Sequence, residues 1–123
     1  KGKKDLMYPD NVSKMFASSN LEKFNNALQR SKKIASLVSG SGIVSVLKGM
    51  IARPSRVSVM EKGQVPCLWI LGGMDNYINC EIIQTKVKLP CNAEVVILKN
   101  SGHLGFIEEE DLSVKILGSF AKR

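Results

Sequence analysis

Two short, uninterrupted apolar runs constrain the fold more than any other feature of this sequence. The first, Cys67–Leu71, follows Pro66 and ends at Gly72-Gly73. The second covers residues 94–98 and is rich in β-branched side chains. Short apolar runs of this kind are typical of strands that are buried on both faces, as in a parallel sheet. The sequence therefore predicts an α/β fold with two neighbouring parallel strands.

A helical pattern follows each of these runs, at residues 81–88 and 111–121. The acidic residues 108–110 precede the second helix, and negative charge is favourable near a helix N-terminus. The order strand, helix, strand, helix implies a right-handed parallel unit. The side chains expected to face inward are Ile82, Ile83 and Val87 in the first helix and Leu112, Ile116, Leu117 and Phe120 in the second.

The first half of the chain has the spacing of helices. One helix is predicted from Pro9-Asp10 to about Ser18, and a second follows a cap at Ser19 or Asn20. The glycine-containing segment 39–42 breaks the second helix, and Pro54 ends the third at or before residue 53. We expect a helical segment at 1–62 and an α/β segment at 63–123. The side chains expected to face inward are Val12, Met15, Phe16, Leu21, Phe24, Ala27, Leu28, Ile34, Ala35, Val38, Ile43, Val46, Leu47 and Met50.

Charge and length limit the possible classes of protein. The 123 residues fit one domain, and the net charge is +7. Residues 1–62 carry twelve Lys and Arg against four Asp and Glu, but these basic residues are scattered and few aromatic residues lie among them. We therefore expect a solvated helical surface and no nucleic-acid partner. No apolar run approaches the roughly 20 residues of a membrane helix, so no membrane span is expected.

The N-terminus and the cysteines bear on the origin of the chain. The sequence begins Lys-Gly-Lys-Lys, without Met and without the apolar core of a secretory signal. We expect the chain to begin partway through a longer protein.

Cys67, Cys80 and Cys91 have no paired spacing, and His103 is the single histidine. The sequence therefore predicts no metal, no cofactor and no disulfide framework, and the cytoplasm is the expected compartment.

Two ionisable residues follow the predicted strands. Asp75 comes after the first strand and His103 after the second. The carboxyl ends of neighbouring parallel strands meet at one edge of a sheet, where ligands and catalytic groups gather. A carboxylate at this edge can hold an imidazole in one tautomer and stabilise its charged form. Taken alone, each residue has an ordinary interpretation: Asp75 as a turn or cap residue, and His103 as a surface residue. Their joint placement favours a catalytic pair.

These two stretches resemble the C-terminal part of an α/β-hydrolase. Residues 65–75 are similar to that family's penultimate strand and the turn that bears the triad acid. Residues 98–108 are similar to the last strand and the loop that bears the triad histidine, and the final helix matches as well. More loosely, residues 5–53 resemble the lid region of small esterase-like members. The resemblance implies a partial α/β-hydrolase fold in which a helical lid segment precedes the strand-helix-strand-helix unit.

The resemblance also implies a Ser-Asp-His catalytic triad, with Asp75 as the acid and His103 as the general base. In this family the serine comes first along the chain, within a Gly-x-Ser-x-Gly turn. Ser41 lies between two glycines, but Ser39 and Ile43 occupy the positions where that turn has glycine. We interpret Ser41 as part of a helix break or cap. The nucleophile and the oxyanion donors would then lie outside this chain.

The leading hypothesis is the C-terminal part of a serine hydrolase that acts on small carboxylic esters. The chain alone would be inactive, and it would pair with a missing N-terminal half or self-associate through a sheet edge, because two central strands need covering. The alternative is a non-catalytic binding or assembly module with a basic face, for which salt-sensitive binding would be the sign. Candidate pocket residues are Phe16, Phe24, Leu47 and Met50, for each of which core packing is the competing interpretation, and Met74 and Leu104 beside the catalytic pair.

Overall fold

The computed structural model describes residues 11–86 and 89–123. Its centre is a two-stranded sheet in which β1 (Cys67–Gly72) pairs with β2 (Ala93–Leu98). The strands are parallel, and Gly72 at the end of β1 lies opposite Leu98 at the end of β2. The predicted parallel pair is therefore confirmed, and both strands end at the same edge of the sheet.

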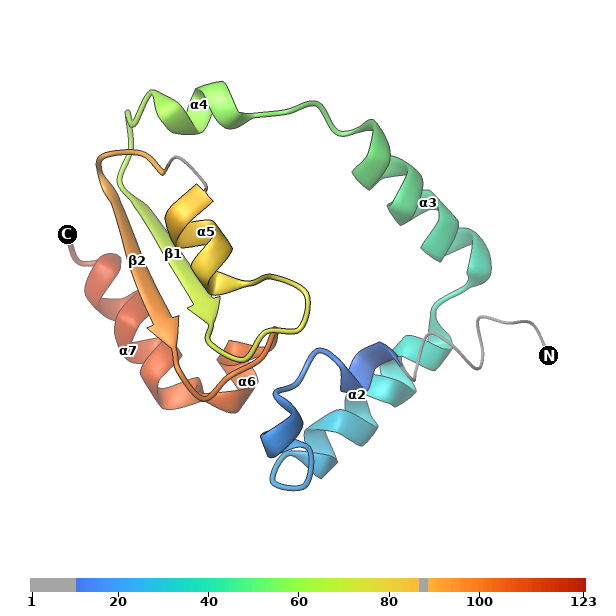
Figure 1. Ribbon diagram of the computed structural model, residues 1–123. Coiled ribbons are helices and arrows are strands. Elements are labelled where there is room, and N and C mark those ends of the chain that lie inside the picture. The colour runs from blue at the N-terminus through green and yellow to red at the C-terminus, as the bar shows by residue number, and fades with distance from the viewer. Residues whose placement is uncertain (1–10, 87–88) are drawn as a thin grey trace.

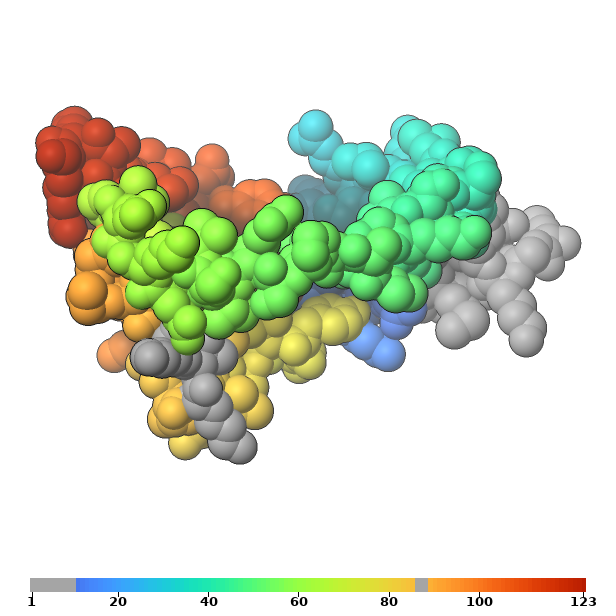
Figure 2. Space-filling view, turned by 90° about the horizontal axis from the view of Figure 1, so that it is seen from above, coloured from blue at the N-terminus to red at the C-terminus, as the bar shows by residue number. Residues whose placement is uncertain are grey.

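Helices cover the two faces of this sheet. The crossover helix α5 (Cys80–Lys86) lies on one face, and α7 (Glu110–Phe120) lies on the other (Figures 1 and 2). A short helix, α6 (Gly105–Glu108), separates β2 from α7 and was not predicted as a separate element. This strand-helix-strand-helix order is the predicted one, and it leaves the loops after β1 and β2 side by side.

The helical segment contains η1 (Ser18–Asn20), α2 (Asn25–Leu37), α3 (Gly40–Ala52) and α4 (Val57–Glu61). The Ser39 hydroxyl accepts a hydrogen bond from the Gly42 N–H at 3.0 Å and so caps α3. As predicted, the break between α2 and α3 lies at this serine and the end of α3 lies before Pro54. Helix α4 was not predicted.

Two predictions for the start of the helical segment are wrong. The first helix was expected to reach about Ser18, but in the described residues the helical backbone covers 11–13 and gives way to turns at 14–16. The Met15 carbonyl instead accepts hydrogen bonds from the His103 and Leu104 N–H groups. Neither Ser19 nor Asn20 caps α2, which begins at Asn25. The Asn20 side chain donates to other segments, described below.

The buried core of the helical segment joins it to the sheet. Val12, Phe16, Leu28 and Ala35 form one buried cluster. The partly buried side chains packed against this cluster are Leu21, Phe24, Ala27, Leu104 and Ile107. Because Leu104 and Ile107 follow β2, this core fastens residues 12–35 to the end of the sheet where the loops meet.

Several apolar side chains expected to face inward are exposed. Helix α3 has no buried residue. Together with α4 it runs across the surface of the molecule, from the end of α2 to the start of the sheet (Figure 2). Ser113, rather than its apolar neighbours, is the buried residue of α7. The physical reason is that the described elements cover these side chains only in part, although fully burying one such side chain contributes about 1.5–3 kcal/mol. Val87 lies outside the described residues. The wrongly predicted positions are Ile34, Val46, Leu47, Met50, Ile82, Leu112 and Leu117.

A helix must be both long and apolar to cross a membrane. Among the described residues, no single helix meets both criteria; α2 and α3 meet them only as a pair, by length and composition, and are bent by 95° at their junction.

Candidate active site

The turn after β1 carries Asp75, and backbone contacts hold this turn against the loop after β2. The Gly73 N–H donates to the Leu98 carbonyl at 2.8 Å, and the Met74 N–H donates to the Ser101 carbonyl at 2.9 Å. The approach leaves no room for a side chain at Gly72, where an added Cβ would lie 2.0 Å from the Gly102 carbonyl oxygen. Glycine at position 72, the last residue of β1, is therefore required by this close approach.

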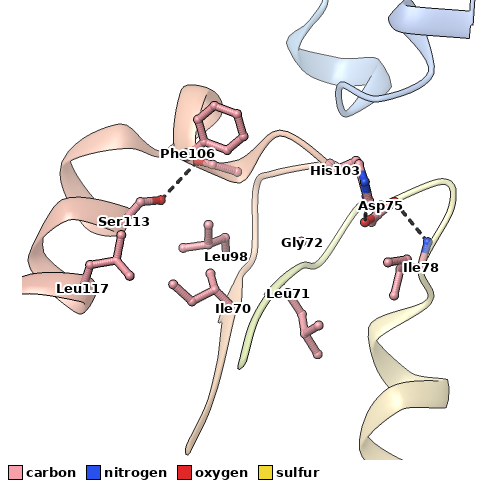
Figure 3. A pocket seen from close by; sticks show the side chains of 12 residues that line it. Ile70, Leu71, Gly72, Asp75, Ile78, Leu98, His103, Phe106, Ser113 and Leu117 are labelled. Atoms are coloured by element: carbon pink, nitrogen blue, oxygen red, sulfur yellow. Dashed lines mark hydrogen bonds and ion pairs between the residues drawn. The ribbon is translucent and has the colours of Figure 1, made fainter. Parts of the chain in front are cut away.

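The loop after β2 carries His103, and its imidazole reaches the Asp75 carboxylate. His103 Nδ1 lies 2.8 Å from Asp75 Oδ2. The Asp75 side chain is 5% exposed, whereas that of His103 is 35% exposed. Asp75 is therefore the buried member of the pair, and His103 is the member that solvent can reach (Figure 3).

The second oxygen of Asp75 is also occupied. Asp75 Oδ1 accepts from the Tyr77 N–H at 2.7 Å and from the Ile78 N–H at 3.1 Å. Burial of this carboxyl opposes its ionisation, but the hydrogen bonds from His103 and from these two N–H groups hold the pKa of Asp75 below its ordinary value. Asp75 is therefore ionised at neutral pH and accepts a hydrogen bond at each oxygen.

An ionised carboxylate can only accept hydrogen bonds, so the proton between these residues belongs to His103 Nδ1. This tautomer leaves the lone pair on Nε2, in a side chain that is partly exposed. The backbone of His103 is fixed as well, because its N–H donates to the Met15 carbonyl at 2.7 Å. The arrangement can therefore accept a proton at Nε2 and stabilise the resulting imidazolium.

Two pockets adjoin the imidazole. A pocket of about 230 Å³ lies between the sheet and α7, where Ile70 and Leu98 lie toward Leu117 (Figure 3). A second pocket, of about 410 Å³, lies between the helical segment and the loop after β1. The residues that line this second pocket are Asn11, Val12, Met15, Met50, Tyr77 and His103.

The predicted pocket residues of the helical segment do not all lie near His103. Met50 and Leu47 are both exposed on α3, but only Met50 lines the second pocket with His103. Phe16 is fully buried and Phe24 packs against the same core, so the competing interpretation, core packing, holds for both.

The two residues that flank the pair also differ. Leu104 packs against the core of the helical segment. Met74 is exposed, and its Sδ lies 3.6 Å from the Ser19 hydroxyl. Ser41 lies in the first turn of α3 with its hydroxyl 3.1 Å from that of Ser39, which agrees with its interpretation as part of a helix start.

Sequence reasoning missed two features of this site. The Tyr77 ring packs edge-on against the His103 ring with centroids 5.7 Å apart, and the Tyr77 hydroxyl donates to the Asn11 carbonyl. Its position two residues after Asp75 was an available signal. The contact of the Met15 carbonyl with the histidine loop had none, because a backbone acceptor does not depend on residue type.

A protein metal site needs several ligating side chains close together. Within residues 11–86 and 89–123, no three His, Cys, Asp or Glu side chains come together in a way that could hold a metal ion. Cys67, Cys80 and Cys91 are free.

Comparison with known proteins agrees with the fold. No protein-family model matches the chain, and no curated protein matches it. Among solved structures, the chain is similar to an esterase (EaEST) from Exiguobacterium antarcticum, with a TM-score of 0.76 and 19% sequence identity. The match covers 98% of this chain but 44% of the esterase, so the chain spans less than half the length of that protein. The chain therefore has a partial α/β fold that is similar to part of that esterase.

Proposed function

We propose that this chain is the C-terminal part of a serine hydrolase that cleaves small carboxylic esters. The observation that carries the proposal is the 2.8 Å contact between His103 Nδ1 and Asp75 Oδ2 at the shared edge of two parallel strands. The similarity of the fold to part of an esterase supports the same class of reaction.

In the proposed reaction, His103 Nε2 accepts the proton of a serine hydroxyl as the serine oxygen attacks the ester carbonyl. The same proton then passes to the departing alcohol, which leaves an acyl-enzyme. His103 next accepts a proton from water, whose oxygen attacks the acyl carbon. It returns that proton to the serine oxygen as the bond between this oxygen and the acyl carbon breaks and the carboxylic acid leaves. Asp75 keeps the imidazole in one tautomer and stabilises its charged form. The serine and the oxyanion donors belong to sequence outside this chain.

The proposal includes a partner, which is the remaining part of the same hydrolase fold. The described sheet has two strands, and helix α3 exposes most of its apolar side chains. Exposed apolar side chains gathered on one helix are typical of an interaction site or an incomplete core. A strand edge without a partner can pair with another strand. The esterase with the similar fold is more than twice as long as the matched segment. We therefore assign the open faces to an N-terminal part that completes the sheet.

The test uses the hydrolase assembled from this chain and the N-terminal part. Turnover of an activated ester such as p-nitrophenyl acetate should fall by about 10⁶-fold in His103→Ala, because the general base is lost. Lys115→Ala, at an exposed position of α7, is the control and should retain full turnover. Unchanged turnover in His103→Ala would remove this residue from the mechanism.

The isolated chain provides the second half of the test. It should give no acyl-enzyme burst with the same ester, because the proposed nucleophile lies elsewhere. A burst from the chain alone would contradict the assignment of the serine. Self-association in place of pairing, measured by sedimentation, would contradict the proposed partner.

A further inference from the structure

A buried carboxylate outside the Asp75–His103 pair has its own set of hydrogen bonds. Glu108, the last residue of α6, is 5% exposed. Its Oε2 accepts from the Ala17 N–H at 2.9 Å and from the Asn20 side-chain amide at 2.7 Å. Its Oε1 accepts from the Gly102 N–H at 2.8 Å. Burying a carboxylate is costly unless its oxygens are hydrogen-bonded, so these three donors are what stabilise the charge.

The three donors come from two segments that are far apart in the sequence. Gly102 immediately precedes His103, whereas Ala17 and Asn20 belong to the helical segment. Glu108 therefore links the histidine loop to residues 17–20. The link is tight, because an added Cβ at Gly102 would lie 2.5 Å from the Ala17 nitrogen.

A second link joins the same two segments on the other side of Gly102. The Met15 carbonyl accepts from the His103 N–H at 2.7 Å and from the Leu104 N–H at 3.2 Å. The backbone N–H groups of residues 102, 103 and 104 are thus held in sequence, the first by Glu108 and the other two by Met15.

The carboxylate of Glu109, the next residue, accepts hydrogen bonds from a different part of the molecule. Glu109 accepts from the Asn100 N–H at 3.0 Å and from the Ser101 hydroxyl at 2.6 Å. Both of these donors lie within the loop after β2, so Glu109 shapes that loop without reaching the helical segment. Glu108 is the carboxylate that joins the two parts.

We propose that Glu108 is a positioning residue for His103. Its carboxylate fixes the peptide that leads into His103, and so directs the imidazole toward Asp75. It also makes the position of the imidazole depend on the docking of residues 15–20, so that His103 meets Asp75 correctly only while the helical segment is in place. The catalytic meaning of this role rests on the proposed function, but the effect on the His103–Asp75 contact does not.

The test observes the imidazole directly. His103 is the only histidine of the chain, so the imidazole nitrogen signals of the 123-residue chain in NMR spectra belong to it. In the wild-type chain we expect one tautomer, with a hydrogen-bonded proton on Nδ1. Glu108→Gln replaces one acceptor oxygen by an NH₂ group, which leaves at least one of the three N–H donors without an acceptor. The variant should lose the single-tautomer signature and the slowly exchanging Nδ1 proton.

Two further variants complete the design. Glu110→Gln removes an exposed charge two residues away and should keep the wild-type imidazole spectrum. Asn20→Asp places a carboxylate against Glu108 and should disturb the imidazole in the same direction as Glu108→Gln. If Glu108→Gln does not fold, Asn20→Asp tests the proposal in its place. Asn20 is only partly buried, so we expect this variant to fold. Folded Asn20→Asp or Glu108→Gln with the wild-type tautomer signature would overturn the proposal.

Catalysis in the assembled hydrolase gives an independent readout. Glu108→Gln should lower kcat by about 100-fold through misplacement of the base, with KM changed by no more than about twofold. A loss confined to KM would contradict a positioning role. A disturbed imidazole in Glu108→Gln, together with a wild-type assembly that hydrolyses no ester, would refute the proposed function while leaving the positioning role intact.

Discussion

His103 and Asp75 are 28 residues apart in the sequence, and their side chains meet with Nδ1 and Oδ2 at 2.8 Å. The contact is determined by the backbone. Parallel pairing aligns the ends of β1 and β2, and the hydrogen bonds from Gly73 and Met74 to the loop after β2 bring the two turns together. The relationship between the two side chains is therefore a consequence of the sheet and its glycine-containing turn.

Asp75→Asn tests the role of the acid in the assembled hydrolase. An amide can donate a hydrogen bond to Nδ1 and so favours the tautomer in which Nε2 carries the proton and cannot accept another. We expect kcat to fall by about 10⁴-fold. Asp111→Asn, at an exposed position of α7, is the matched control and should be nearly unchanged. A fall of less than tenfold in Asp75→Asn would show that the carboxylate does not orient the base.

The lowered pKa of Asp75 predicts a dependence of stability on pH. A carboxyl whose pKa is lower in the folded state contributes stability that is fully present above its ordinary value of 3.8. This contribution is lost as the pH falls through the lower, folded-state pKa, because the unfolded chain then binds the proton more readily. The free energy of unfolding should therefore decrease below about pH 4.

The variant Asp75→Asn isolates this contribution. In chemical denaturation at several pH values, the wild type should lose more stability between pH 4 and lower pH than Asp75→Asn does, whereas Asp111→Asn should follow the wild type. Equal slopes in the wild type and Asp75→Asn would mean that the pKa of Asp75 is the same in the folded and unfolded chains.

The close approach at Gly72 predicts a large cost for adding one methyl group. In Gly72→Ala the new Cβ would lie 2.0 Å from the Gly102 carbonyl oxygen, so the two turns must separate. We expect a loss of at least about 1–3 kcal/mol in the free energy of unfolding, which is typical of overpacking. Gly118→Ala is the control, because nothing lies within 4 Å of its added Cβ and alanine favours the helix. Denaturation curves that rank Gly72→Ala as stable as the wild type would contradict the described approach of the turns.

The sheet and the contact between Asp75 and His103 were predictable, because both depend on local signals in the sequence. Two apolar runs, each followed by a glycine-containing turn or loop, predict neighbouring parallel strands, and such strands bring Asp75 and His103 to one edge of the sheet. The expected burial of both strand faces is wrong, because only Leu71 and Leu98 of the two strands are buried. The break at Ser39 and the end of α3 before Pro54 are local in the same sense, since a cap and a proline act on the next few residues.

The start of the helical segment was not predictable, because long-range contacts override its local pattern. Asparagine commonly caps helices, but the Asn20 amide donates to the Asn100 carbonyl and to Glu108 instead. Helical spacing also overstated burial, because an apolar face is buried only where another element covers it. Ile34 and Val46 continue the helical pattern and were expected to face inward, but both are exposed, since the described elements leave them largely uncovered.

The pocket shared by Met50 and His103 leads to a prediction about substrate binding. Most of its lining is apolar, with Val12, Met15 and Tyr77 beside these two residues, so it suits the acyl or alcohol part of an apolar ester. Met50→Glu would place a charge against that part of the substrate. The loss of contacts worth about two methylene groups is about 1.5 kcal/mol, or roughly tenfold in affinity. We expect KM for p-nitrophenyl butyrate to rise about tenfold with little change in kcat.

Ile51→Glu is the matched control for this prediction, because Ile51 is the next residue of α3 and is 86% exposed. It adds the same charge to the same helix outside the pocket and should leave both kinetic constants near their wild-type values. Equal effects of the two substitutions on KM would attribute the change to the charge of the helix rather than to the pocket. A fall in kcat specific to Met50→Glu would instead place Met50 close enough to His103 to affect the proton transfer itself.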